Sequence, residues 1–235
     1  MQFSGYIFDV EGTLIDCVQQ NLLSLQESLA NFGVAVPFEL LQLYSGLDGD
    51  QTLQIIAPAI GSDERKKVLE TRAKIYEGKY LGTTKPFAGV RDVLEAIARM
   101  GGRIALATDC KGPELKHYRS LLDVDDLIAC VACGDDVDHG KPDPRLVGMA
   151  VRRLGVPVKQ AIMIGDTPYD AEAASSAGVA AAGLLTGGFA KDALLGAGCV
   201  IIADDLRALL PSLESGSCDE GSPELWASRR HHQPD

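Results

Sequence analysis

The sequence predicts an α/β fold, a doubly wound and Rossmann-like parallel sheet with a helical segment inserted after its first strand. Short apolar runs alternate along the chain with stretches of helical periodicity, which is typical of a parallel sheet covered on both faces. More than 80 residues separate the first run from the second, far more than one crossover helix needs. The chain has 235 residues, 46% of them hydrophobic and 23% charged, which suits such a core with an insertion.

Six apolar runs are expected to form the strands, because each is short and ends in polar or turn residues. They are residues 5–8, 103–107, 127–133, 161–164, 179–185 and 199–202. Helices are expected between them, where apolar residues recur at helical spacing and a glycine follows. The clearest are the stretch from Val90 to Met100, before Gly101, and the stretch from Leu146 to Leu154, before Gly155.

The long stretch after the first strand has helical patterns of its own and no clear strand, as the spacing of Leu22, Leu25 and Leu29 illustrates. We therefore expect residues 1–15 and 86–211 to form the α/β core and residues 16–85 to form a helical cap domain. A short helix is expected at 204–210. Residues 212–235, rich in Ser, Gly, Pro, Glu and Arg, are expected to be a flexible tail.

Charge and cysteine content exclude several classes of protein. The formal net charge is −11, which disfavours nucleic acid and anionic membranes as partners, since both are polyanions. No window approaches 18 consecutive apolar residues, and the first 16 residues lack a basic leader. Six cysteines are too sparse for a disulfide scaffold. The expectation is a cytoplasmic protein in a reducing compartment.

Polar side chains follow the ends of three predicted strands. Asp9 and Glu11 come after the first, Thr108 and Asp109 after the second, and Asp166 after the fourth. Because ligands bind beyond the carboxyl ends of parallel strands, these groups are expected to lie on one rim, together with Lys141 and Asp170 from the following loops.

Several carboxylates at one place repel one another unless a cation joins them, and an all-oxygen ligand set suits Mg²⁺. A hydroxyl, a lysine and a divalent cation together make a site for a phosphoryl group, and a carboxylate can act as the nucleophile. The residues alone therefore predict Mg²⁺-dependent phosphoryl transfer.

Four motifs in this order resemble those of the haloacid dehalogenase superfamily, in its branch with a helical cap. The resemblance spans residues 3 to about 210, and its motif spacing is most similar to that of phosphoglycolate-phosphatase-like members. The motifs are Phe8-Asp9-Val10-Glu11-Gly12-Thr13-Leu14, Ala107-Thr108, Gly140-Lys141-Pro142 and Gly165-Asp166-Thr167-Pro168-Tyr169-Asp170.

The resemblance implies a role for each matching position. Asp9 would attack phosphorus, Glu11 would protonate the leaving oxygen and then activate water, and Thr108 and Lys141 would complete the catalytic set. The phosphate-binding set would comprise Asp9, Gly12, Thr108, Asp109 and Lys141. The Mg²⁺ ligands would be Asp9, the backbone carbonyl of Glu11, Asp166 and Asp170.

Two positions depart from the family pattern. Glu11 stands where most of the phosphatases have Asp, and Asp109 stands where Asn or Ser is frequent. Glu11 resembles the motif of enolase-phosphatases, so phosphatase chemistry is retained while the rate is in question; the role of Asp109 stays open.

The expected activity is hydrolysis of a small phosphorylated metabolite, a phosphoglycolate-like phosphomonoester, through an aspartyl-phosphate. Two alternatives stay open: a metal-free 2-haloacid dehalogenase of the same superfamily, and a catalytically weak metabolite-binding module. The cap loop 45–50 lacks Lys and Arg, which disfavours a second phosphate on the substrate. Whether the protein is a monomer or a homodimer is left open.

Overall fold

A computed structural model describes residues 3–215 and confirms the α/β class. Its main sheet has six parallel strands in the order β5-β4-β1-β6-β7-β8, and each strand starts within two residues of a predicted run. β1 therefore lies at the centre, between the two halves of the sheet, where the strand order reverses. The strands are β1 (Gly5–Phe8), β4 (Arg103–Ala107), β5 (Ile128–Ala132), β6 (Ala161–Gly165), β7 (Ala180–Leu184) and β8 (Ile201–Ala203).

Helices cover both faces of this sheet. Alternate residues of the central strand are apolar and point to opposite faces, so both faces have to be buried. Tyr6 and Phe8 belong to one apolar cluster, and Ile7 belongs to the other. The first cluster is covered by α5 (Val90–Arg99), α6 (Gly112–Leu122) and α10 (Leu206–Ser215). The second is covered by α7 (Arg145–Leu154), α8 (Pro168–Ser176) and α9 (Lys191–Ala197). Single 3₁₀ turns occupy Gly134–Asp136, Val158–Gln160 and Leu185–Gly187.

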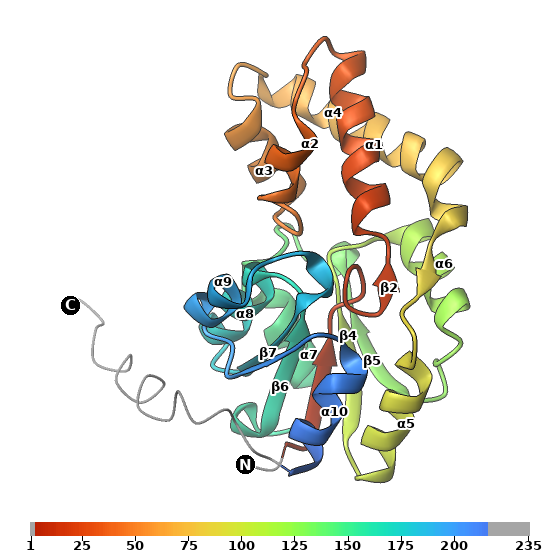
Figure 1. The fold of residues 1–235 in the computed structure, drawn as a ribbon, viewed down its shortest axis with the longest axis vertical. Coiled ribbons are helices and arrows are strands. Elements are labelled where there is room, and N and C mark those ends of the chain that lie inside the picture. The colour runs from red at the N-terminus through yellow and green to blue at the C-terminus, as the bar shows by residue number, and fades with distance from the viewer. Residues whose placement is uncertain (1–2, 216–235) are drawn as a thin grey trace, which may run out of the picture.

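Residues 18–83, which come between β1 and α5, build a separate helical layer over one edge of the sheet (Figure 1). Fully buried Leu29, Leu41, Leu53 and Val68 belong to an apolar cluster of its own. The last helix of this layer continues through a π-helical turn, Tyr76–Tyr80, and a 3₁₀ turn, Leu81–Thr83. The helices are α1 (Val18–Asn31), α2 (Phe38–Gln42), α3 (Gly49–Ile56) and α4 (Ser62–Ile75), and we call this layer the helical insert.

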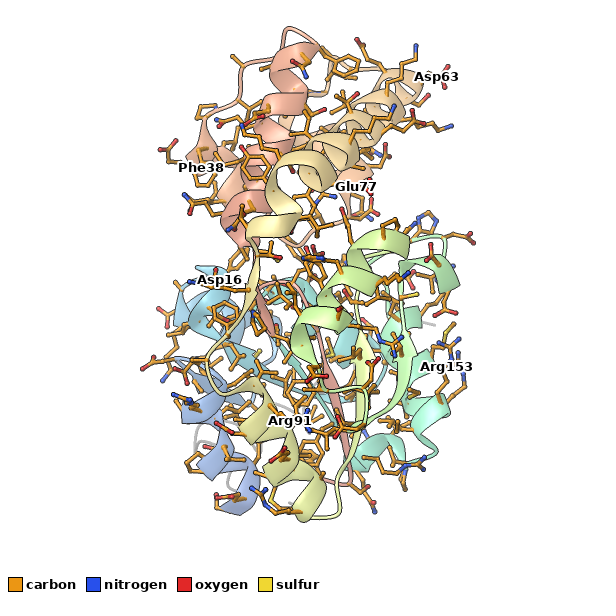
Figure 2. All side chains as sticks on the ribbon, turned by 90° about the vertical axis from the view of Figure 1, so that its right-hand side faces the viewer. Asp16, Phe38, Asp63, Glu77, Arg91 and Arg153 are labelled. Carbon is orange, nitrogen blue, oxygen red and sulfur yellow. The ribbon has the colours of Figure 1, made fainter. Side chains whose placement is uncertain are left out.

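A two-stranded antiparallel ribbon joins the helical insert to the rest of the chain. β2 (Ile15–Asp16) pairs with β3 (Lys85–Pro86), and Figure 2 shows Asp16 where the two parts of the molecule meet. The expectation that residues 16–85 contain no strand was therefore wrong at the two ends of this range. Two residues per strand are too few to give an alternating pattern in the sequence.

The C-terminal helix is longer than expected. α10 runs through Pro211 to Ser215, so residues 212–215 are helical rather than tail. The reason is burial of Leu213, one helical turn beyond Leu209, in the apolar cluster of the sheet. The rest of the predicted tail, 216–235, lies outside the described residues.

Two further features bear on the expectations for the protein's surroundings. The five cysteines within 3–215 are free thiols. In the same range, no helix combines the length and the apolar character that crossing a bilayer requires. The cytoplasmic location stays a prediction.

Candidate active site

The functional side chains of the central strand and its two neighbours meet at the carboxyl edge of the sheet. The parallel register places Phe8 beside both Leu106 and Ile164, so the residues that follow these three strands leave the sheet at similar heights. Asp9 also donates its backbone N–H to the Ile164 carbonyl, at 2.9 Å. Asp9 and Asp166 are thereby brought to the same edge, as the sequence predicts.

Lys141 reaches this edge from the loop before α7, and it is 3% exposed. Its Nζ lies 2.5 Å from Asp9 Oδ1 and 2.7 Å from Asp170 Oδ1, and it lies 4.0 Å from Asp109 Oδ2. Burial alone would lower the pKa of Lys141, but the carboxylates of Asp170 and Asp9 outweigh it and raise the pKa above the usual range. The lysine is therefore a cation between two carboxylates.

Three buried carboxylates, those of Asp9, Asp166 and Asp170, share the site with this one lysine. They present oxygens that lie within 4.8 Å of one another. Burial, together with the carboxylate of Asp170, raises the pKa of Asp166 to about 8. Burial likewise raises the pKa of Asp9. When all three are ionised, one lysine leaves the group with surplus negative charge, which a bound cation would balance.

One oxygen of the Asp166 carboxylate is free to bind a cation. Its Oδ1 accepts a hydrogen bond of 2.7 Å from the Thr13 hydroxyl, but its Oδ2 is buried without a partner among residues 3–215. Asp170 is held differently, because its Oδ2 accepts from the backbone N–H and the hydroxyl of Thr167, at 3.1 and 2.7 Å. Oxygen ligands of this kind suit Mg²⁺, so the residues present fit the ion that the resemblance implies.

Two glycines leave room around the unpartnered oxygen. A Cβ on Gly12, whose φ is 81°, would lie 2.2 Å from Asp166 Oδ2, and a Cβ on Gly187 would lie equally close. The backbone at Gly12 is held by Thr186, whose hydroxyl donates a hydrogen bond to the Gly12 carbonyl at 2.6 Å. Backbone from two loops thus surrounds Asp166, and no side chain larger than hydrogen fits there.

Glu11 is held by two hydrogen bonds to the same oxygen. Its Oε1 accepts from Asn21 Nδ2 at 2.8 Å and from the Tyr118 hydroxyl at 3.1 Å. Asn21 belongs to α1 of the helical insert, and Tyr118 belongs to α6 beside the sheet. The Tyr118 hydroxyl is also hydrogen-bonded to that of Tyr76, so both parts of the molecule fix the position of this carboxylate.

Thr108 and Asp109 behave differently from each other. Thr108 is fully buried, and its hydroxyl lies 3.1 Å from the Cys110 sulfur. Asp109 accepts from the backbone N–H of Lys141 with both oxygens, at 3.2 Å, and burial raises its pKa to about 6. Of the predicted phosphate-binding residues, Asp9, Asp109 and Lys141 line the cavity described next, whereas Gly12 and Thr108 do not.

A cavity of about 510 Å³ lies over the carboxylates, between the sheet edge and the helical insert. The loop that begins at Ser45 forms part of its wall, and Gly46, with φ 80°, approaches Thr167 so closely that a Cβ would lie 2.6 Å from Thr167 Cγ2. The volume suits a small molecule. The acidic groups of this loop have structural partners, since Asp48 caps α3 and Asp50 pairs with Arg65 at 2.7 Å.

Sequence reasoning missed several polar residues of the cavity wall. Asn21, Arg72 and Glu114 line it, and Tyr118 lies behind Glu11. None of them carries a signal in the sequence that marks it as a wall residue, although Arg72 precedes Tyr76 by four residues, the spacing at which side chains of one helix face meet. Three lysines from the second half of the helical insert and its return to the core, Lys74, Lys79 and Lys85, do not line it.

Comparisons with known proteins agree with this geometry. The chain matches the haloacid dehalogenase-like hydrolase family over residues 6–184. A phosphoglycolate phosphatase of Pseudomonas savastanoi pv. phaseolicola is 30% identical over 217 residues, covering 87% of this chain and 78% of that protein. A phosphorylated carbohydrates phosphatase of Thermotoga maritima is 28% identical over 177 residues, covering 74% and 81%.

A solved structure shows the same fold. The crystal structure of a hydrolase from Pseudomonas syringae superposes with a TM-score of 0.84 at 27% identity, covering 90% of this chain and 98% of that one. With the family match spanning most of the sequence and the sheet edge carrying the four motifs in place, the chain belongs to the haloacid dehalogenase-like hydrolases.

Proposed function

We propose that the protein is a Mg²⁺-dependent phosphatase that hydrolyses a small, phosphoglycolate-like phosphomonoester through an aspartyl-phosphate. The observation that carries the proposal is the arrangement around Lys141, whose Nζ contacts Asp9 and Asp170 beside the unpartnered oxygen of Asp166. A nucleophile, a cation and a place for a second cation adjoin one small cavity. The names of the two phosphatase relatives support the same class of reaction.

The first step transfers the phosphoryl group to Asp9. A carboxylate oxygen of Asp9 attacks phosphorus while the ester P–O bond breaks, and Glu11 donates its proton to the leaving alcohol oxygen. Lys141, which lies 2.5 Å from Asp9 Oδ1, neutralises negative charge as the new bond forms. Asp9, Asp166, Asp170 and the Glu11 carbonyl would hold Mg²⁺, which would supply further positive charge at the phosphoryl site.

The second step returns the enzyme to its starting state. Glu11, now ionised, takes a proton from water, and the resulting hydroxide attacks phosphorus, so that inorganic phosphate leaves and the Asp9 carboxylate is regenerated. The hydrogen bonds from Asn21 and Tyr118 keep the Glu11 carboxylate at the cavity wall in both steps. Thr108, which follows β4, stays a predicted phosphate ligand, and its hydroxyl lies behind the residues that line the cavity.

The helical insert acts in this proposal as a cap domain over the reacting groups. It has its own apolar cluster, its chain leaves and re-enters the core at the β2–β3 ribbon, and it contributes one wall of the cavity. A wall of this kind excludes water from the phosphoryl group and contacts the leaving group. We therefore assign the chemistry to the sheet edge and the choice of substrate to the insert.

The test is the replacement of the nucleophile, Asp9→Asn, assayed for phosphate release with Mg²⁺ and again with excess chelator. We expect a loss of more than about 1,000-fold, because an amide is a far weaker nucleophile. Asp126→Asn, which alters an exposed ion pair with Arg91, is the matched control and should keep full activity. Full Mg²⁺-dependent hydrolysis by Asp9→Asn, or 2-haloacid turnover that survives the chelator, would overturn the proposal.

A further inference from the structure

The wall of the cavity opposite the sheet edge carries one partly buried cation. Three basic side chains line the cavity: Lys141, Lys111 and Arg72. Lys141 is engaged by Asp9 and belongs to the phosphoryl site. Lys111 is exposed. Arg72, on α4 of the helical insert, has 23% of its side chain exposed, so it faces the cavity from a protected position.

Arg72 is held in place from three sides. Its guanidinium carbon lies 4.9 Å from the centre of the Tyr76 ring, it donates to Asn21 Oδ1, and its Nη1 lies 3.3 Å from Glu114 Oε1. A guanidinium fixed in this way has lost most of its side-chain freedom before any ligand arrives. Its planar fork of N–H donors matches the two oxygens of a carboxylate.

Arg72 lies close to the place where the leaving group must be. The Asn21 amide bridges the two sites, because its Nδ2 donates to Glu11 Oε1 at 2.8 Å while its Oδ1 accepts from Arg72. Two hydrogen bonds and one amide group span at most about 8 Å. Glu11 contacts the leaving oxygen in the proposed reaction, so a group a few bonds beyond that oxygen comes within reach of Arg72.

The present partner of Arg72 is a weak one. Glu114 makes a single contact at 3.3 Å, and burial together with the nearby Glu11 carboxylate raises its pKa to about 7. A carboxylate that is costly to ionise binds a cation less well than a ready-made anion does. An anionic group of a ligand could therefore replace Glu114 as the partner of Arg72.

We propose that Arg72 is the receptor for a carboxylate on the leaving group, displacing Glu114 when substrate binds. The substrate class is then a phosphorylated hydroxy acid whose carboxylate lies one carbon from the ester oxygen. This inference rests on the proposed phosphatase function. A second phosphate fits less well, because the same wall carries the carboxyl groups of Asp48 and Glu77.

Two substrates that differ only in the carboxylate test this assignment: 2-phosphoglycolate and 2-hydroxyethyl phosphate, each with Mg²⁺. For the wild type we expect kcat/KM to favour the carboxylate by about 100-fold, since a site built for a charged group rejects the analogue that lacks it. Arg72→Met should lower kcat/KM for phosphoglycolate by about 100-fold and that for hydroxyethyl phosphate by less than about 3-fold. Arg72→Lys, which keeps the charge without the fork, should fall between.

Arg65→Met is the matched control. It removes an arginine and an ion pair, with Asp50, from the same helix, but position 65 does not line the cavity, so both kcat/KM values should stay unchanged. An unaltered substrate preference in Arg72→Met would overturn the assignment. If that variant does not fold, a wild-type preference near one would overturn it equally. Phosphate release from neither substrate by the wild type would instead refute the proposed function itself.

Discussion

Replacing Tyr118 by phenylalanine removes one of the two hydrogen bonds to Glu11 and leaves the ring in place. The hydroxyl lies 3.1 Å from Glu11 Oε1, and the residue is fully buried, so the variant removes one polar atom and little packing volume. Glu11 would then be held by Asn21 alone. A general acid that is less well placed transfers its proton less often at the moment the ester bond breaks.

The magnitude follows from the bond that is lost. A hydrogen bond to a charged group contributes about 1.5–3 kcal/mol. The remaining bond from Asn21 retains part of the positioning, so we expect about 1.4 kcal/mol to be lost from the transition state, a 10-fold fall in kcat. The fall should be seen with an alkyl phosphate, whose leaving group needs a proton. With an aryl phosphate such as p-nitrophenyl phosphate, whose leaving group needs none, it should be less than about 3-fold.

Tyr76→Phe is the control for this prediction. Both variants remove the hydrogen bond between the hydroxyls of Tyr76 and Tyr118, but only Tyr118→Phe also removes a donor from Glu11. Both are expected to melt at a lower temperature than the wild type, because each loses a buried hydrogen bond. Equal falls in kcat for the two variants, or equal falls for the alkyl and aryl substrates, would refute the claim that Tyr118 positions the acid.

Two further changes test the cation site and the surface. Gly187→Ala should raise the Mg²⁺ concentration for half-maximal activity by about 10-fold or more, because its Cβ would lie 2.2 Å from Asp166 Oδ2. Gly196→Ala, whose Cβ would meet nothing within 4 Å, is the control. Equal Mg²⁺ requirements in the two variants would contradict the assignment of Asp166 as a metal ligand. Asp136→Asn should lower the free energy of unfolding at neutral pH by about 1 kcal/mol, allowing for partial exposure of the ion pair with Arg153. The Arg153 guanidinium lowers the pKa of Asp136 to about 2, so this contribution is complete above about pH 4 and is lost as the pH falls towards 2. Urea titrations of variant and wild type across that range should show the gap closing, and a constant gap would contradict the assignment.

The cluster of carboxylates and lysine at the sheet edge could be predicted from the sequence because it depends on few and simple relations. Asp9 and Asp166 each follow directly on a buried strand, and neighbouring parallel strands end at the same edge. Lys141 belongs to a short motif rather than a strand end, and its place between Asp9 and Asp170 agrees with the convergence expected for it. Each of these relations is either a short motif in the sequence or a property shared by all strands of a parallel sheet.

The opposite wall could not be predicted, because its contacts depend on how two separately packed parts meet. Tyr118 is 107 residues from Glu11, and it looks like an ordinary apolar position of an amphipathic helix. Arg72 reads as one more charged residue of a polar helix until the fold places it beside Glu114. Pairings of this kind have no periodicity, and a single sequence carries no other signal for them.

The β2–β3 ribbon has a consequence for how such proteins change. Because Ile15 pairs with Pro86 and Asp16 with Lys85, the chain leaves the core and returns to it at hydrogen-bonded neighbours. The sheet therefore needs nothing from the intervening residues to close its ladder. A different helical segment could be spliced between these positions without moving Asp9 or Lys141. If the proposed function holds, new leaving-group preferences can be acquired by exchanging one contiguous stretch, provided that the new segment supplies a hydrogen-bond donor to Glu11 in place of Asn21.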